Sequence, residues 1–194
     1  MVIDPQTLPK IWFLRHGETY WNAERRIQGQ LESDLTSKGR QQAQAQAQLM
    51  SPILAQAPDC YVSPLGRAQQ TALIALGQTP FHTDARLAEA HAGEWQGLLR
   101  DEVRRDFPKI VAPDVSALEM FVAAPGGESF EVFQGRIVDF VTDLTGPSVI
   151  VAHGLLGQVL RGLILGLSRP QMSNLPNEQA CVYLLENGTE TVLR

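Results

Sequence analysis

The chain has 194 residues, of which 44% are hydrophobic and 19% are charged, a composition typical of one globular domain with a core of its own. Its formal net charge of −5 argues against nucleic acid or an anionic membrane as a partner, although a few side chains are enough to form a local basic pocket. We therefore expect a single domain over residues 1–194.

The first predicted strand leads into a glycine turn that carries two chemically active side chains. Residues 1–10 have no basic start followed by an apolar run, so we expect no secretory signal. The apolar run at residues 11–13 predicts a buried strand, which ends at Arg15, His16 and Gly17. Ligands bind outside the carboxyl ends of strands in open α/β sheets, so this position predicts a binding site.

Two helices follow, separated by a short strand. Ala and Gln are good helix formers, and the apolar residues among them recur on one face, so we predict a helix over residues 37–56. A strand is predicted at residues 60–62. A second helix is predicted over residues 63–76, with Ser63 as its cap and Arg67 in its first turn.

The middle of the chain is expected to be less regular. We predict a short strand at residues 80–83, a loop at 87–97 and a short helix at 101–107. Residues 108–127 hold prolines, paired glycines and small residues, so an irregular excursion is expected there. The stretch around residues 90–127 is predicted to resemble a lid.

The last part of the chain alternates helix and strand again. Apolar residues at helical spacing predict a core helix over residues 130–144, and the apolar run 148–152 predicts a buried strand. The next helix begins after His153, and strands are predicted near residues 181–185 and 189–193. This alternation predicts an α/β fold, a three-layer α/β/α sandwich with a mostly parallel sheet.

Membrane insertion, disulfides and metal sites are not expected. The most apolar late stretch, residues 154–167, is too short to span a bilayer, which favours a cytoplasmic protein. Cys60 and Cys181 lie in apolar, strand-like runs and are expected to be buried free thiols. No Asp, Glu and His residues have metal-ligand spacing, so we expect no metal and no other cofactor.

Two histidines occupy the same local setting. His16 and His153 each follow an apolar strand and precede a glycine, so neighbouring strands would place them across one pocket. Arg15 and Arg67 lie at a strand end and a helix start, and the helix that begins at Gly154 would point free N–H groups into the same space. Each residue alone has an ordinary structural interpretation, but together they predict a site for a dianionic phosphoryl group.

Four segments carry these residues. They are LRHGET at 14–19 followed by Trp21 and Asn22, SPLGRAQQT at 63–71, the run at 87–97 that contains Glu89, and VAHG at 151–154. In this order, and over residues 11–185, they resemble the motifs of the histidine phosphatase superfamily, also called phosphoglycerate mutase-like. The third segment resembles the one that carries the proton donor of that family.

The resemblance implies phosphoryl transfer through His16. His16 would attack phosphorus in line and form a phosphohistidine, while Arg15, Arg67 and His153 hold the phosphoryl oxygens. Glu89 would protonate the leaving oxygen and later deprotonate water, which requires burial or a nearby dianion to keep a proton on it. His16 must be neutral, with its other ring nitrogen fixed by an acceptor such as a backbone carbonyl. The expected substrate contacts are Asn22, Gln28, Gly29, Arg100 and Gly154.

Departures from the family pattern favour hydrolysis over mutase activity. The mutases carry a tyrosine where this chain has Ala92 and a lysine where it has Arg100. Ala88 and Asp34 replace a common arginine and proline, and these changes bear on the identity of the substrate rather than on the chemistry. The mutases also have an insertion with two arginines that grip the substrate carboxylate, with no clear counterpart at residues 105–125. A mutase needs such a grip to keep water from the phosphoenzyme.

The leading hypothesis is a metal-independent phosphomonoesterase that hydrolyses a small phosphorylated metabolite. The alternatives are a cofactor-dependent phosphoglycerate mutase and a non-catalytic module that binds phosphorylated ligands. The sequence does not identify the substrate. It does not decide the oligomeric state either, and a homo-oligomer is one of the alternatives.

Three polar residues have separate predictions. His91, two residues from Glu89, is expected either to line the pocket or to lie in a surface loop. His82 is expected to be exposed. Ser129 follows a Pro-Gly-Gly turn and is expected to cap the next helix.

Overall fold

The computed structural model describes residues 3–112 and 114–194. Met1 and Val2, at the start of the run expected to lack a secretory signal, and Pro113, within the predicted lid, lie outside the described residues. None of the described helices is both long enough and apolar enough to cross a membrane.

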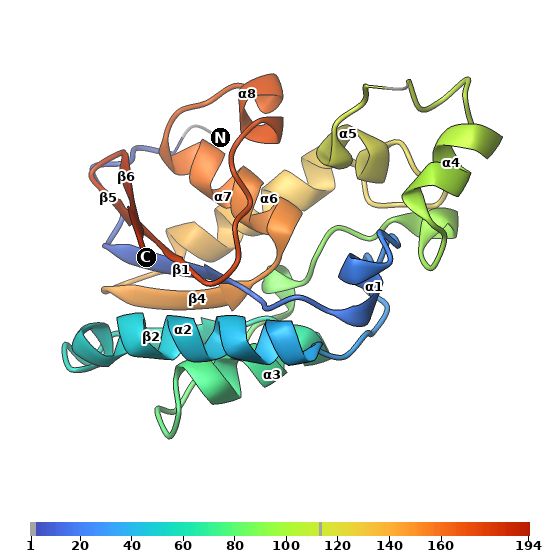
Figure 1. Ribbon diagram of the computed structural model, residues 1–194. Helices are drawn as coiled ribbons and strands as arrows, with labels where there is room; N and C mark the ends of the chain where they lie inside the picture. The colour runs from blue at the N-terminus through green and yellow to red at the C-terminus, as the bar shows by residue number, and fades with distance from the viewer. Residues whose placement is uncertain (1–2, 113) are drawn as a thin grey trace.

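The described residues form a six-stranded sheet with helices around it (Figure 1). The strands are β1 (Ile11–Arg15), β2 (Asp59–Val62), β3 (His82–Thr83), β4 (Ser148–Ala152), β5 (Val182–Glu186) and β6 (Thr189–Leu193). The α-helices are α1 (Tyr20–Ala23), α2 (Ser37–Leu54), α3 (Gly66–Ala75), α4 (Arg100–Asp106), α5 (Ala117–Val122), α6 (Phe130–Thr142), α7 (Gly154–Ile164) and α8 (Arg169–Ser173).

The strand order is β3-β2-β4-β1-β5-β6, and the sheet is mostly parallel, as predicted. β4 lies between β1 and β2 and pairs in parallel with both, and β2 pairs in parallel with β3. β5 and β6 form an antiparallel edge beside β1. The carboxyl ends of the three central parallel strands therefore meet at one edge of the sheet.

Helices cover both faces of the sheet, which confirms the three-layer α/β/α sandwich (Figure 1). Successive side chains of a strand point to opposite faces. Phe13 and Ile150 pack in the cluster formed with α6 and α7, whereas Leu14 and Val151 pack in the cluster formed with α2 and α3. Because both faces are buried, the central strands are continuously apolar rather than alternating.

The second long helix begins later than predicted, at Gly66 rather than at Ser63. Ser63 does not cap it, since the Ser63 hydroxyl lies 2.6 Å from Nε2 of His153. The N–H of Gly66 donates instead to Glu32, whose two carboxylate oxygens each lie 3.0 Å away. The prediction was wrong because a side chain from another part of the chain satisfies this helix end.

The region predicted as loop and lid contains more regular structure than expected. Short 3₁₀ turns occur at Ala85–Leu87 and Gly93–Trp95. Within residues 108–127, which we expected to be irregular, Ser116 caps α5, and Phe121 of that helix is buried. Such a short helix depends on tertiary packing, which the local pattern does not show. The four-residue α1 and five-residue α8 were missed for the same reason.

Other local predictions are confirmed. Ser129 caps α6 by accepting the N–H of Val132 at 3.3 Å. His82 is exposed, and Cys60 and Cys181 are buried free thiols. α4 and α5 lie beyond the carboxyl ends of β1 and β4 (Figure 1). The predicted lid therefore lies next to the sheet edge at which a ligand was expected.

The packing of α6 gives a test of the core. Phe133 is fully buried, so Phe133→Ala is expected to lower the free energy of unfolding by about 3–5 kcal/mol, measured by urea unfolding. Val132, its neighbour on α6, is 60% exposed, and Val132→Ala is the matched control, with a change below about 0.5 kcal/mol. Equal effects of the two substitutions would contradict this packing.

Candidate active site

The carboxyl ends of three neighbouring strands bring two histidines and a serine together. His16 follows β1, His153 follows β4 and Ser63 follows β2. The N–H of His16 donates to the carbonyl of Ala152, and that of Ser63 to the carbonyl of Val151, both at 3.0 Å. The strand pairing thus continues into the site. The two imidazole rings have their centroids 5.2 Å apart.

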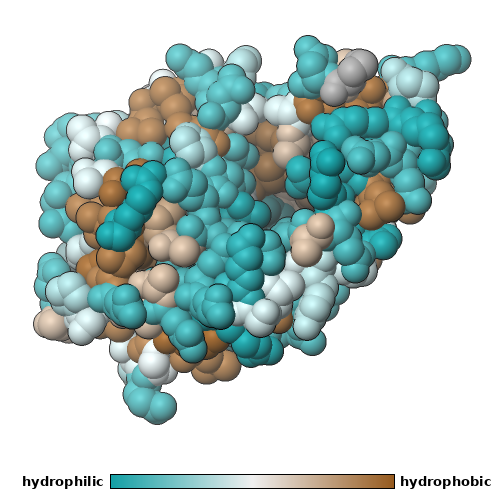
Figure 2. Space-filling view, viewed as in Figure 1, coloured by the Kyte–Doolittle hydropathy of each residue, from teal (hydrophilic) through white to brown (hydrophobic). Residues whose placement is uncertain are grey.

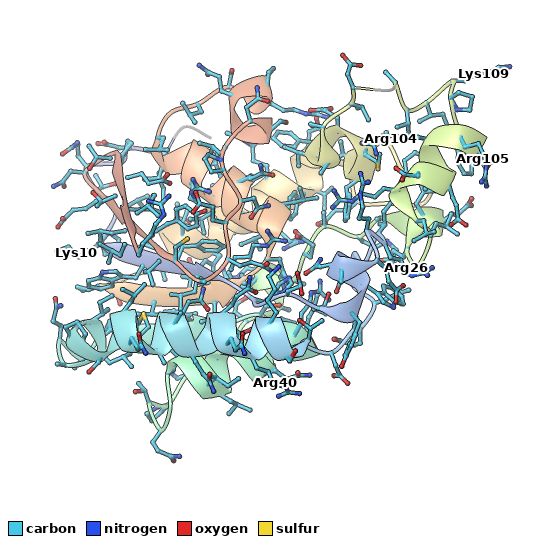
Figure 3. The ribbon with its side chains drawn as sticks, viewed as in Figure 1. Lys10, Arg26, Arg40, Arg104, Arg105 and Lys109 are labelled. Atoms are coloured by element: carbon cyan, nitrogen blue, oxygen red, sulfur yellow. The ribbon has the colours of Figure 1, made fainter. Side chains whose placement is uncertain are left out.

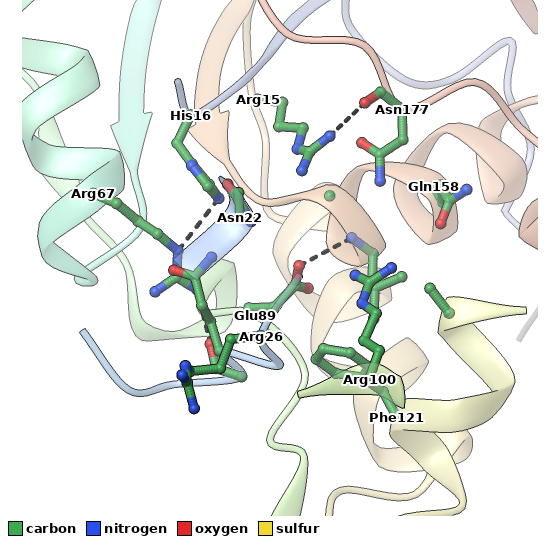
Figure 4. Close-up of a pocket in the computed structure, with 15 residues that line it drawn as sticks. Arg15, His16, Asn22, Arg26, Arg67, Glu89, Arg100, Phe121, Gln158 and Asn177 are labelled. Atoms are coloured by element: carbon green, nitrogen blue, oxygen red, sulfur yellow. Dashed lines mark hydrogen bonds between the residues drawn. The ribbon is translucent and has the colours of Figure 1, made fainter. Parts of the chain in front are cut away.

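The ring of His16 is neutral, and the lone pair of its Nε2 accepts the Nε–H of Arg67. Its Nδ1 lies 2.7 Å from the carbonyl oxygen of Gly17, and because a carbonyl only accepts, Nδ1 carries the hydrogen. Burial lowers the pKa of His16 well below its usual range, and the charges of Arg67 and Arg15 lower it further. Nε2 faces Nε of Arg67 at 3.3 Å (Figure 4).

Arg15 and Arg67 are held by main-chain carbonyls. Arg67 donates to the carbonyls of Leu31 at 3.0 Å and Gly29 at 2.8 Å, and Arg15 donates to the carbonyl of Asn177. Burial lowers the pKa of both arginines from its usual range, and a guanidinium in a protein stays charged at neutral pH. Nε of Arg15 is buried and has no hydrogen-bond partner among the described residues.

Glu89 occupies the N-terminus of α7. One carboxylate oxygen accepts the N–H of Leu155 at 3.0 Å, and the other accepts those of Leu156 at 3.0 Å and Ala90 at 3.1 Å. The expectation that the free N–H groups of this helix face the phosphoryl site is therefore wrong for Leu155 and Leu156. A buried carboxylate needs donors, and a helix N-terminus supplies them together with its positive dipole end.

A second layer of contacts fixes the backbone of Glu89. Its carbonyl accepts Nε2 of Gln30 at 3.0 Å and a guanidinium nitrogen of Arg136 at 3.1 Å. Arg136 is in turn paired with Glu128 at 2.8 Å, with both side chains largely buried. Glu128 therefore supports Arg136 and the position of Glu89 rather than lining the cavity.

His91 belongs to the supporting loop. It is absent from the residues that line the cavity, and its Nδ1 accepts the N–H of Gly93 at 3.1 Å. Its own N–H donates to Glu128 at 3.3 Å. Of the two roles that the sequence left open, the structure favours the loop role.

A cavity of about 280 Å³ opens between the sheet edge and α4 and α5 (Figures 2 and 4). Nine of the predicted site residues line it: Arg15, His16, Asn22, Gln28, Gly29, Arg67, Glu89, Arg100 and Gly154. His153 is buried beside them and packs against the ring of His16. The structure thus brings every predicted site residue to one place.

The cavity also has lining residues that sequence reasoning missed. They are Arg26, Ala117, Phe121, Leu155, Gln158 and Asn177. Gln158 had a usable signal, because it lies four residues after Gly154 and so on the same face of α7. Phe121 and Asn177 come from a short helix and a loop with no pattern that points to the site.

The two glycines that follow the histidines are packed closely. At Gly17 a Cβ would lie 2.2 Å from the carbonyl oxygen of Gly39, and because this atom is backbone, close approach requires glycine there. At Gly154 a Cβ would lie 2.5 Å from Nδ2 of Asn177 and 3.3 Å from Nε of Arg15, so a side chain there would displace Asn177, which lines the cavity.

The chemistry of the site is that of an anion receptor with a neutral imidazole. No group of three or more His, Cys, Asp or Glu residues within 3–112 and 114–194 is arranged to hold a metal ion. Guanidinium groups match the oxygens of a phosphoryl group, and the lone pair of His16 can attack phosphorus. Glu89 lies across the cavity, and its carboxyl group is of a type that can act as an acid or base (Figure 4).

Comparison with known proteins agrees with this chemistry. The model of the histidine phosphatase superfamily (branch 1) matches residues 11–192. Glucosyl-3-phosphoglycerate phosphatase of Mycolicibacterium vanbaalenii is 36% identical over 178 residues, covering 81% of this chain and 75% of that protein. Metal-independent phosphoserine phosphatase of Arabidopsis thaliana is 34% identical over 173 residues, covering 82% and 69%. The structure of Bacillus stearothermophilus YhfR is 31% identical, with a TM-score of 0.80 and 95% of both chains covered.

The two buried histidines make the free energy of unfolding depend on pH. An unfolded histidine takes up a proton below about pH 6.5, whereas burial lowers the pKa of His16 and His153 well below that value. Below about pH 6.5 the unfolded state therefore binds more protons, and stability falls by up to about 1.4 kcal/mol per pH unit for each histidine. Urea unfolding between about pH 7.5 and about pH 5 is expected to show a shallower slope for His16→Gln than for the wild type. Identical slopes would contradict this electrostatic account.

Proposed function

The chain belongs to the histidine phosphatase superfamily (branch 1) and is a phosphatase, and we propose that it hydrolyses a small phosphorylated metabolite through a phosphohistidine on His16. The observation that carries this proposal is the state of the His16 ring. The carbonyl of Gly17 holds the hydrogen on Nδ1, and the pKa lowered by burial keeps the ring neutral, so Nε2 is a nucleophile at neutral pH. No metal takes part in the reaction that we propose.

In the first step, Nε2 of His16 attacks phosphorus in line as the bond from phosphorus to the leaving oxygen breaks. Glu89 gives its proton to that oxygen as the general acid. Arg15 and Arg67 stabilise the negative charge on the equatorial oxygens. In the second step, water attacks the phosphohistidine while Glu89 takes its proton, which frees phosphate and restores His16.

The far end of the cavity has the properties of a second anion site. Arg100 is half-buried, and its Nε is buried without a hydrogen-bond partner among the described residues. Burial and the charges of Arg104 and Arg25 lower its pKa. In Figure 4, Arg100 lies beside Phe121 and across Glu89 from His16. We propose that Arg100 binds a second negative group of the substrate. The glycerate and serine parts of the substrates for which the two relatives are named each carry a carboxylate.

Phosphoglycerate mutase activity remains the second candidate, because two arginines line the far end of the cavity. Arg26 and Arg100 together resemble a carboxylate grip, although Arg26 is already paired with Glu24 at 3.0 Å. No described arginine of residues 105–125, where the mutases carry their grip, lines the cavity. Incubation with 3-phosphoglycerate separates the candidates, since a phosphatase releases phosphate and a mutase yields 2-phosphoglycerate. A module that only binds would do neither.

His16→Ala removes the proposed nucleophile. We expect the rate of aryl phosphate hydrolysis to fall by at least about 1,000-fold, measured as release of the phenol. A phosphohistidine does not survive acid, so the phosphoenzyme is trapped in alkaline denaturant. The wild type should then carry the phosphoryl group of a labelled substrate, and the variant should not.

His82→Ala is the matched control for this experiment, because His82 is exposed on β3 and does not line the cavity. It should keep the wild-type rate. Excess chelator should also leave the rate of the wild type unchanged. Full activity of His16→Ala, or complete loss of activity in chelator, would contradict the mechanism.

Arg100→Gln tests the second anion site. We expect kcat/KM for a phosphomonoester that also bears a carboxylate to fall by about 10- to 100-fold, the effect of losing a hydrogen bond between charged groups. The value for a neutral aryl phosphate should change by less than about threefold. Arg105→Gln is the control, since Arg105 lies on the outer side of α4 and pairs with Asp106 at 2.7 Å (Figure 3). An equal loss on both substrates would contradict a specific role for Arg100.

A further inference from the structure

The hydroxyl of Ser63 contacts the second histidine and also accepts one N–H of its own turn. Its Oγ lies 2.6 Å from Nε2 of His153 and 3.3 Å from the main-chain N of Leu65. The backbone of Ser63 is held separately, because its N–H donates to Val151 and its carbonyl accepts Nε2 of Gln69 at 2.6 Å. Ser63 and His153 are both fully buried.

The hydrogens around this hydroxyl follow from what each atom can donate. The N–H of Leu65 only donates, so Oγ accepts it and has its own hydrogen left for Nε2 of His153. Burial, with a further contribution from Arg67, lowers the pKa of His153 well below its usual range, so the ring carries one hydrogen. If that hydrogen were on Nε2, the hydroxyl hydrogen would have no acceptor among the described residues. Nε2 therefore accepts, and Nδ1 carries the hydrogen.

The Nδ1–H of His153 is then a donor that awaits a ligand. Nδ1 is buried and has no hydrogen-bond partner in the part of the chain that the structure describes. His153 does not itself line the cavity, but its ring packs against that of His16, which does, so the ring lies beside the phosphoryl end. An unpaired buried N–H is costly, and a phosphoryl oxygen held beside His16 would satisfy it.

We propose that Ser63 is a positioning residue that selects the tautomer of His153, so that the Nδ1–H of His153 donates to the phosphoryl group in the reaction. The proposal rests on the proposed function, because the phosphoryl group is the acceptor that the donor awaits. Without the hydroxyl, the neutral ring of His153 can carry its hydrogen on Nε2 instead. The lone pair of Nδ1 then faces a phosphoryl oxygen, which repels it most strongly when negative charge develops in the transition state.

The tautomer can be measured in the free protein without turnover. Long-range ¹H–¹⁵N correlation spectra of protein labelled with ¹⁵N-histidine distinguish a protonated from an unprotonated ring nitrogen. We expect the hydrogen of His153 on Nδ1 in the wild type and at least partly on Nε2 in Ser63→Ala. A wild-type hydrogen on Nε2, or an unchanged tautomer in Ser63→Ala, would overturn the proposal.

Ser148→Ala is the matched control, because Ser148 is a buried serine at the opposite end of β4, where its hydroxyl donates to Gly146 at 2.8 Å. This control should keep both the tautomer and the rate of the wild type. A change of tautomer in Ser148→Ala as large as in Ser63→Ala would show a general loss of packing and overturn the proposal.

Kinetics give the second readout. For Ser63→Ala we expect kcat on an aryl phosphate to fall by about 10- to 100-fold with less than about a threefold change in KM, since the lost contact acts mainly in the transition state. Ser63→Thr restores a hydroxyl and should return kcat to within about threefold of the wild type. A kcat for Ser63→Ala within about twofold of the wild type overturns the proposal.

If Ser63→Ala does not fold, the tautomer of His153 in the wild type and the kcat of Ser63→Thr still test the proposal. A wild type that has the expected tautomer but hydrolyses nothing would overturn the proposed function and leave the contact between Ser63 and His153 in place.

Discussion

Buried positive charge around one cavity is the constraint on which the rest of the site depends. Four of the lining residues are arginines, and only Glu89 among them is acidic. This charge acts with burial to lower the pKa of His16 and His153, which keeps both rings neutral. Nε of Arg15 and Nε of Arg100 are buried and have no hydrogen-bond partner among the described residues. A bound anion relieves a site of this kind, because buried charge is stable only when it is paired.

The way each arginine is held separates the arginines that serve the ligand from those that serve the fold. Carbonyl oxygens orient Arg15 and Arg67 without cancelling their charge. Arg136 and Arg161, by contrast, are paired with the carboxylates of Glu128 and Glu190 and are neutralised where they lie. Main-chain carbonyls therefore fix a guanidinium in place and leave its charge available for a ligand. A carboxylate partner would fix it in place but neutralise its charge.

The sequence predicted the site better than it predicted the contacts within it. The apolar strands before His16 and His153, each followed by a glycine, were enough to place both rings at one edge of the sheet, since parallel strands end together. Local rules failed where a distant partner decides the outcome. Glu32 replaces Ser63 as the cap of α3, and Glu89 takes the helix N-terminus that was expected to face the phosphoryl group. No local pattern carries this information, because the partners lie dozens of residues apart.

The two ends of the cavity differ in how they are built, and this difference bears on how the fold can accept different substrates. The phosphoryl end comes from strand ends joined by main-chain hydrogen bonds, so a change there would disturb the sheet itself. The far end comes instead from two short helices, α4 and α5, and from the loop at Asn177. Its main-chain link to the body lies at the start of α4, where the N–H of Arg100 donates to the carbonyl of Arg25 at 3.1 Å. Loops and short helices tolerate substitution better than central strands do. Substitutions at Arg100 or Phe121 can therefore change what the phosphoryl group is attached to while His16, Arg67 and Glu89 keep the same chemistry.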